Sequence, residues 1–177
     1  MKYLITLFLF ANYATAAMNK NLPENLFIES DQYKLCKQHA IKYAYIVKIA
    51  YVGLYLKDCK SDQDLLNISD KLIRFNYQVN VKAHIFSDAA KKYFMKNVLN
   101  AVSQHELIEL NRFNEFYENV KATEYYDLYH QQGKRLKLFK NEKLLGISEN
   151  KSFSYNYFNI WFGNNPAVKP LKRSFIN

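Results

Sequence analysis

The residues that could carry out acid-base or metal chemistry in this chain are few and scattered. The 177-residue sequence has four histidines and two cysteines, and the histidines fall in different predicted elements without the His/Cys/carboxylate pattern typical of a metal site. It has no H-E-x-x-H motif, and with 4 glycines it holds neither a phosphate loop nor a G-x-S-x-G elbow. We therefore predict no catalytic residue, no metal and no cofactor. Each histidine is expected at the surface or in a hairpin: His39, His84, His105 and His130.

A row of glutamates suggests paired-carboxylate catalysis at first sight. Glu106, Glu109, Glu115 and Glu118 belong to a helix predicted over residues 106–120. They lie opposite its apolar stripe, which is the pattern of a solvated helix face. We therefore expect them to be exposed and to have no catalytic role.

The aromatic residues raise the alternative of a binding pocket. The chain has 15 tyrosines, and rings with polar tips line many small-molecule clefts. Most of these tyrosines occupy strand positions, where core packing explains them equally well. Lys48 is the one charge on an otherwise apolar strand over residues 43–56, which makes it the first candidate for a functional titratable group.

The elements that must position these residues follow from hydrophobic periodicity. The strand at 43–56 is apolar on both faces, which is typical of mid-sheet strands, whereas 72–81 alternates and predicts one buried and one polar face. Strands come first, then two helices, then strands, then two short helices, which favours an α+β domain with a large antiparallel sheet and helices on one face. The other predicted elements are strands at 27–35, 124–130, 135–139 and 144–147, and helices starting at Ser87 or Asp88 and covering 106–120, 152–162 and 168–175.

The two cysteines leave a disulfide as an open alternative. A hairpin over residues 33–56 that turns near 42–44 places the partner of Cys36 near residue 52, with Cys59 beyond it. A disulfide needs Cα atoms within about 7 Å. The predicted register therefore favours two separate thiols.

The N-terminus has the composition of a signal peptide. Lys2 precedes an apolar core over residues 4–10, and Ala14-Thr15-Ala16 forms a small-residue cleavage site. We expect residues 1–16 to be a signal peptide, 17–26 an N-terminal extension and 27–177 one domain. The protein is then exported, to the periplasm or the medium. No segment is long and apolar enough to span a membrane.

The distribution of charge along the chain indicates which classes of binding partner to expect. The formal net charge is +9, but the Lys and Arg residues are spread along the chain rather than gathered in one segment. Together with export, this argues against a nucleic-acid partner. Anionic headgroups, acidic polymers and carboxylate ligands remain compatible with the charge.

Two local sequence patterns resemble those of a known protein family. Residues 48–56 (KIAYVGLYL) and 160–166 (IWFGNNP), the latter followed by Leu171-Lys172, resemble segments of the chalcone isomerase-like family, in particular its bacterial exported members. The resemblance covers nearly all of residues 27–176. It implies a large antiparallel sheet with helices on one face and a cleft between the 43–56 strand and the first long helix. Tyr93 and Asn100, seven residues apart, resemble a Tyr and Asn pair in the cleft of the plant enzymes.

The same resemblance argues against isomerase chemistry. The resemblance places the Thr of the plant enzymes at Ala50 and their Arg near Gln38, with Lys37 and Lys42 the nearest cations, so groups that would stabilise a phenolate and polarise a carbonyl are missing. Members without the catalytic set are similar to non-enzymatic binders, some of them for fatty acids. The resemblance and the basic charge together suggest a small apolar carboxylate as ligand. The candidate contacts are Tyr93, Asn100, Lys48 and Tyr51.

Two other functions stay open at this point. The first is an envelope-associated structural or interaction protein, in which side chains fill the cleft and Tyr93 packs without a cavity. The second is an unrecognised enzyme, which requires a titratable group with a strongly displaced pKa in the cleft. The sequence identifies no protein partner.

Overall fold

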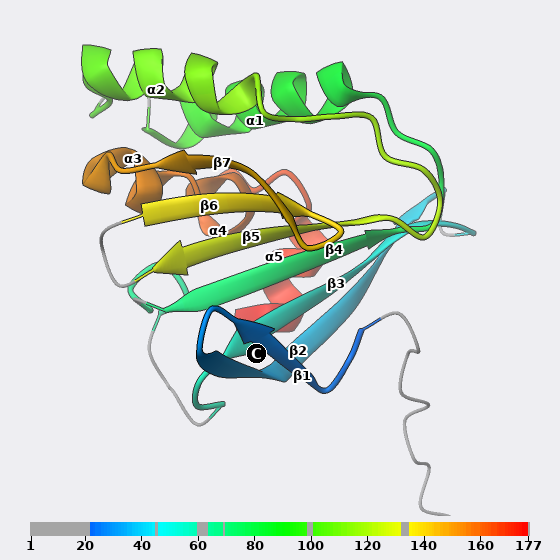
Figure 1. The fold of residues 1–177 in the computed structure, drawn as a ribbon. Helices are drawn as coiled ribbons and strands as arrows, with labels where there is room; N and C mark the ends of the chain where they lie inside the picture. Colours follow the sequence, from blue (N-terminus) through cyan, green and yellow to red (C-terminus); the bar gives the residue numbers. More distant parts are fainter. Residues whose placement is uncertain are drawn as a thin grey trace, which may run out of the picture.

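The computed structural model describes residues 22–44, 46–59, 64–68, 70–98, 101–131 and 135–176. These residues form one seven-stranded antiparallel sheet whose strands follow one another in chain order, with five helices (Figure 1). This confirms the predicted α+β class. The strands are β1 Asn25–Ile28, β2 Asp31–Tyr43, β3 Val47–Leu56, β4 Lys71–Tyr77, β5 Tyr125–Gln131, β6 Arg135–Lys140 and β7 Lys143–Ser148.

The helices lie on one face of the curled sheet (Figure 1). Helices α1 (Ala83–Val98) and α2 (Gln104–Asn114) connect β4 to β5. After β7 come α3 (Lys151–Asn156), α4 (Asn159–Phe162) and α5 (Lys169–Ile176). None of the helices in the described ranges is long and apolar enough to cross a membrane.

The main core lies between the sheet and the helices. Because side chains alternate along a strand, every second side chain of β3 and β4 faces the helices. Val52 of β3 and Phe75 of β4 are paired across the two strands on this face. Phe94 of α1 and Phe153 of α3 pack above them with ring centroids 5.7 Å apart. The predicted strand at 72–81 is correct in position but ends earlier, at Tyr77.

The other face of β4 is polar, as its alternation predicted, but it is buried as well. Arg74 and Asn76 are both buried. The Arg74 guanidinium donates to both carboxylate oxygens of Asp127 on β5, at 2.7 and 2.6 Å, and lies 3.8 Å from the centre of the Tyr125 ring. Burial raises the pKa of the Asp127 carboxyl above its usual value, and Arg74 opposes that shift. The sequence did not reveal this burial, because a buried ion pair has the same alternating pattern as a solvated face.

A second, smaller apolar cluster lies on this face and depends on the curl of the sheet. The hydroxyls of Tyr33 on β2 and Tyr129 on β5 are 2.9 Å apart, although β3 and β4 lie between their strands. The turn between β1 and β2 also reaches β6, where Glu29 pairs with Lys137. The segment predicted as a single strand at 27–35 is therefore two strands that turn at Glu29, whose φ is 59°.

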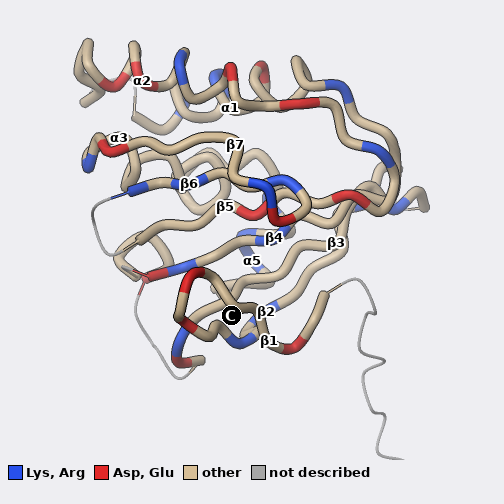
Figure 2. Tube along the Cα trace, in the orientation of Figure 1, with Lys and Arg blue, Asp and Glu red and all other residues tan. Residues whose placement is uncertain are grey.

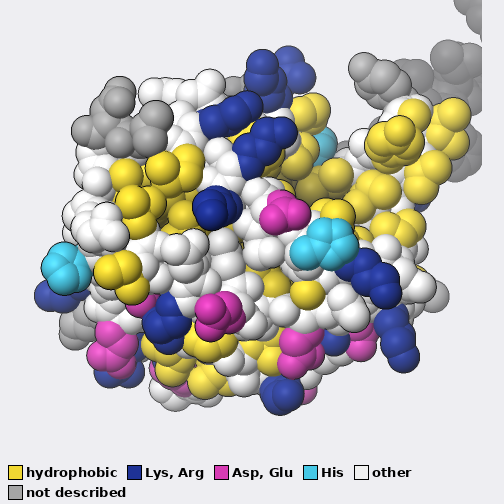
Figure 3. Space-filling model, turned by 90° about the horizontal axis from the view of Figure 1, so that it is seen from above, with side chains coloured by type: hydrophobic (Ala, Val, Ile, Leu, Met, Phe, Trp, Pro, Cys, Tyr) yellow, Lys and Arg dark blue, Asp and Glu magenta, His cyan; other side chains and the backbone are white. Residues whose placement is uncertain are grey.

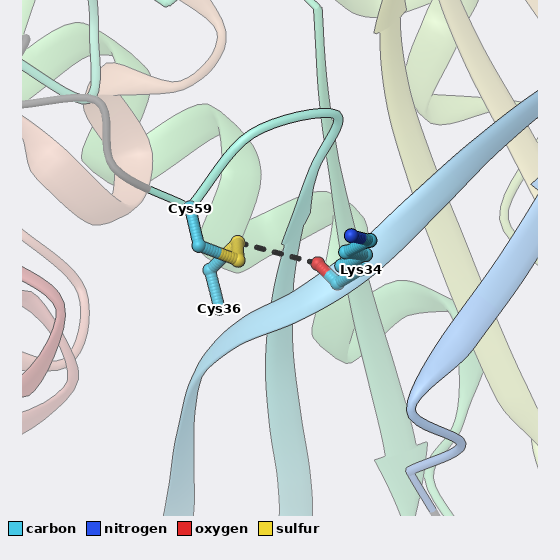
Figure 4. The surroundings of a disulfide bond; sticks show 3 residues. All are labelled: Lys34, Cys36 and Cys59. Atoms are coloured by element: carbon cyan, nitrogen blue, oxygen red, sulfur yellow. Dashed lines mark hydrogen bonds between the residues drawn. A yellow bond between two sulfur atoms is a disulfide. The ribbon is translucent and has the colours of Figure 1, made fainter.

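The two cysteines form a disulfide, and this corrects the expectation of separate thiols. Cys36 and Cys59 are joined with Cα atoms 5.2 Å apart (Figure 4). The hairpin turns between Tyr43 and Val47, later than predicted, and β2 contains a bulge at Cys36. The neighbours of Cys36 therefore lie opposite Tyr55 and Leu54 instead of residue 52, and the chain after β3 turns back to bring Cys59 within reach.

Two further expectations, about the start of a helix and the exposure of a glutamate, are wrong. Helix α1 begins at Ala83, so Ser87 lies inside it and donates to the His84 carbonyl. Glu106 is buried at the start of α2, where it closes a capping box with Ser103 and accepts a hydrogen bond from Asn156. His130 lies in the β5–β6 hairpin, one of the two placements expected for it, and is buried there with its ring 5.5 Å from that of Phe158.

Candidate functional site

An apolar cavity of about 280 Å³ lies between α1 and the sheet, where the resemblance implied a cleft. Its walls come from β2 to β6, from α1, and from α4 and the segment after it. None of the lining residues is charged. They are Ile41, Ile49, Ala50, Phe75, Tyr77, Val81, Ile85, Phe86, Ala89, Ala90, Tyr117, Tyr126, Leu128, Leu138, Ile160, Trp161, Ala167 and Val168.

One wall of the cavity is an aromatic cluster whose hydroxyls stay neutral. Phe86 packs against Tyr77, Tyr117 and Tyr126 with centroid distances of 5.2 to 5.5 Å. The Tyr117 hydroxyl lies 2.8 Å from that of Tyr157, and the Tyr126 hydroxyl donates to the Glu118 carbonyl at 2.7 Å. Burial raises the pKa of Tyr117 to about 12 and that of Tyr77 well above its usual value. The wall therefore carries no charge at physiological pH.

Ile160 and Trp161 of the IWFGNNP segment form another part of the lining, and this segment is hydrogen-bonded to α1. Asn97 donates to the carbonyls of Tyr93 and Asn165, at 2.7 and 3.1 Å, and accepts a hydrogen bond from the Asn165 backbone N–H at 2.7 Å. A Cβ on Gly163 would come within 2.4 Å of the Asn97 side chain and 2.7 Å of a backbone oxygen, so glycine is required for this close approach. The result is a fixed position for Trp161, which packs on Phe75 with ring centroids 5.3 Å apart.

The cavity adjoins a wider, basic depression of about 940 Å³ at the surface. The two share Ile41, Ala167 and Val168, so we call this depression the mouth. Its lining includes the exposed residues Lys42, Lys96 and Lys169. These lysines come from β2, α1 and α5, and Figure 2 shows that Lys and Arg positions are spread over helices and strands alike.

Two further side chains of the mouth have identifiable surroundings. Tyr93 lies between two lysines of α1, with the ammonium groups of Lys92 and Lys96 at 5.5 and 5.3 Å from its ring centre. His39 of β2 is partly buried, and this burial, together with the charge of Lys42, lowers its pKa. A lowered pKa disfavours the charged form of His39, so the positive charge of the mouth comes mainly from its lysines.

The structure brings together only part of the predicted set of ligand contacts. Tyr93 lines the mouth. Lys48 donates to the Tyr51 hydroxyl at 2.8 Å, so these two are neighbours, but neither lines the cavity or the mouth. Asn100 lies outside the described residues.

The positions that correspond to the plant catalytic Arg and Thr differ in their placement. Ala50 lines the cavity, where it presents a methyl group instead of a hydroxyl. Gln38 is exposed and pairs with Gly53, on the face of the sheet away from the helices. The cavity can therefore hold an apolar group, while the polar contacts available to a ligand lie at the mouth.

Sequence reasoning missed several residues of the site. Lys96 and Lys169 resemble any surface lysine in the sequence, and Lys42 was noted only as a cation near the position of the plant Arg. Only the fold brings these three lysines, from three separate elements, to the mouth. The position of Asn97, one helical turn after Tyr93, was visible in the sequence. Its hydrogen bond to Asn165 was not, because the two residues are 68 positions apart. Within the described ranges, no group of three or more His, Cys, Asp or Glu residues could hold a metal ion.

Comparison with known proteins places this geometry in a family. Among solved structures, a fatty-acid binding protein of Arabidopsis thaliana superimposes with a TM-score of 0.63 at 13% sequence identity, covering 88% of this chain and 90% of that one. No curated protein sequence matches. The family model described as chalcone isomerase-like matches residues 14–176. The chain belongs to the chalcone isomerase-like family.

Proposed function

We propose that this protein is a non-catalytic binder of a small apolar carboxylate such as a fatty acid. The observation that carries the proposal is the pairing of an uncharged cavity with a lysine-lined mouth. The fold of the Arabidopsis thaliana fatty-acid binding protein supports it as an analogy. The acyl chain occupies the cavity, and the carboxylate remains at the mouth.

This orientation follows from the cost of burying charge. An ionised carboxylate inside an apolar cavity loses its hydration and finds no charge there, which is strongly unfavourable. At the mouth it stays solvated and meets Lys42, Lys96 and Lys169. The cavity is close to the lower end of the range for small-molecule sites, about 300–1,000 Å³, so chains of medium length suit it best.

The cavity also bears on the alternative of a structural protein with a filled core. That alternative calls for Tyr93 to pack without a cavity. Tyr93 instead lines the mouth, which continues into the space beside Trp161. This arrangement favours a ligand over a filled core.

Export is part of the proposal. The Cys36–Cys59 disulfide supports it, because disulfides persist in oxidising compartments and are rare in reducing ones. The segment predicted as a signal peptide, residues 1–16, lies outside the described residues. We propose that the protein acts in the periplasm or outside the cell.

A plug in the cavity tests the binding site. Ala89→Phe places a ring in the lining from α1, and we expect it to weaken the binding of decanoate at least about tenfold, because the ring and the acyl chain compete for one space. The measurement is isothermal titration calorimetry with decanoate. Ala101→Phe, at an exposed alanine outside the cavity, is the matched control and should bind like the unaltered protein.

The outcome is decisive in both directions. Loss of affinity in Ala89→Phe alone, with an unchanged circular dichroism spectrum, supports the cavity as the site. Equal affinities in all three proteins would show that decanoate binds elsewhere. Absence of binding to the unaltered protein would remove the proposal for medium-chain fatty acids.

A further inference from the structure

The tip of the β2–β3 hairpin exposes a group of large apolar side chains. Tyr43, Ile46 and Val47 are 72%, 84% and 48% exposed. Single exposed apolar residues are ordinary, but three within one turn form a patch. We call these three residues the hairpin tip. Figure 3 shows hydrophobic side chains gathered at the right-hand end of the molecule, where Figure 1 places the ends of β2 and β3.

Lysines flank the hairpin tip, and the stretch of chain that forms it contains no acidic residue. Lys42 and Lys48 pair across the two strands directly behind the tip, and both are exposed. Between Asp31 and Asp58 the sequence contains five lysines and no further Asp or Glu. The tip therefore combines apolar side chains at its end with two exposed lysines, Lys42 and Lys48, at its base.

The strands that carry the hairpin tip also line the cavity. Ile41 and Ile49 lie just behind it on β2 and β3, and both line the cavity. Ile85, on the first turn of α1, also lines the cavity and is 51% exposed. Apolar surface thus continues from the tip into the space proposed for the acyl chain.

We infer that the hairpin tip docks the protein on an anionic lipid bilayer. Tyr43, Ile46 and Val47 enter the interfacial region, and Lys42 and Lys48 contact the acidic headgroups. The charge pattern favours this partner. The apolar residues of the tip match the acyl chains of the bilayer, and the lysines behind them match the anionic headgroups above those chains. If the protein binds a fatty acid as proposed above, docking has a consequence: the fatty acid passes between membrane and cavity along the apolar surface of Ile41, Ile49 and Ile85. This consequence rests on the proposed function, whereas the docking itself does not.

Co-sedimentation with vesicles tests the docking surface. The chain from Ala17 onward should sediment with phosphatidylcholine vesicles that contain phosphatidylglycerol, and less with phosphatidylcholine alone or at high salt. Tyr43→Ser with Ile46→Ser should weaken this binding at least about tenfold. Lys48→Glu should remove most of the preference for the acidic lipid.

Matched controls lie away from the tip. Ile108→Ser removes an isoleucine of α2 that is 57% exposed, and Lys151→Glu reverses an exposed lysine at the start of α3, at the other end of the molecule (Figure 1). Both should sediment like the unaltered protein. If the controls weaken binding as much as the tip variants, or if no protein sediments with acidic vesicles, the inference is wrong.

A second readout separates this inference from the proposed function. Decanoate binding in vesicle-free solution should be unchanged in Tyr43→Ser with Ile46→Ser, because neither residue lines the cavity. Decanoate binding without vesicle binding would leave the proposed function intact and overturn the docking inference. Tip-dependent vesicle binding without decanoate binding would overturn the proposed function and keep the docking surface.

Discussion

Asp127→Asn is expected to lower the free energy of unfolding by about 3–5 kcal/mol. Asp127 is 1% exposed and takes both charged hydrogen bonds of Arg74, which is itself buried. The amide leaves the guanidinium buried without a counter-charge, and that uncompensated charge is the main cost. Urea denaturation followed by circular dichroism measures the change.

Two variants make this prediction specific to the buried pair. Arg74→Met combined with Asp127→Leu should recover most of the loss, because it removes both charges together. Glu149→Gln breaks the exposed contact with Arg135, 3.2 Å long, and should change stability by less than about 1 kcal/mol. A cost below about 1 kcal/mol for Asp127→Asn, or a double variant less stable than the single one, would show that the pair is not a buried ion pair of this kind.

Removing the disulfide is expected to lower the free energy of unfolding by about 3 kcal/mol. Cys36 and Cys59 are 23 positions apart, and opening a loop of that size restores conformational entropy to the unfolded chain. The variant is Cys36→Ser with Cys59→Ser, studied by urea denaturation without reductant. We expect it to remain folded, because Leu65 and Ile68 pack in the core and Lys71 donates to the Leu66 and Ile68 carbonyls in the same segment.

Reductant provides the internal control for this prediction. Dithiothreitol should destabilise the unaltered protein to about the level of the double variant and leave the double variant unchanged. Titration of thiols in the unfolded, unreduced protein should find none. Two reactive thiols, or a stability insensitive to reductant, would contradict the disulfide.

The sequence was sufficient for the order of the elements and for the family. Period-two and helical patterns placed the strands, and the IWFGNNP segment identified the ending that holds Trp161 in the cavity wall. The first long helix was found, but its start was misplaced by four residues or more, because Ala83 is preceded by no capping side chain of the usual type. The Ser103 to Glu106 spacing was a readable capping-box signal that identifies Glu106 as structural.

What could not be predicted depends on register and on long-range contacts. A bulge at Cys36 and a later turn moved the hairpin register, and a change of that size decides whether two cysteines meet. The partner of Arg74 lies 53 positions away, across two helices, so no local pattern could distinguish a buried ion pair from a solvated face. The lysines of the mouth gather for the same reason, since they come from three separate elements.

The most direct test of a fatty-acid site uses the single tryptophan of the chain, Trp161, which lines the cavity. The measurement is its fluorescence during titration with a medium-chain fatty acid that carries bromine on the middle of its acyl chain. Our account predicts saturable quenching at one fatty acid per protein, because the bromine comes to rest beside the indole ring. Binding of the same fatty acid, seen by equilibrium dialysis, without quenching of Trp161 would contradict it.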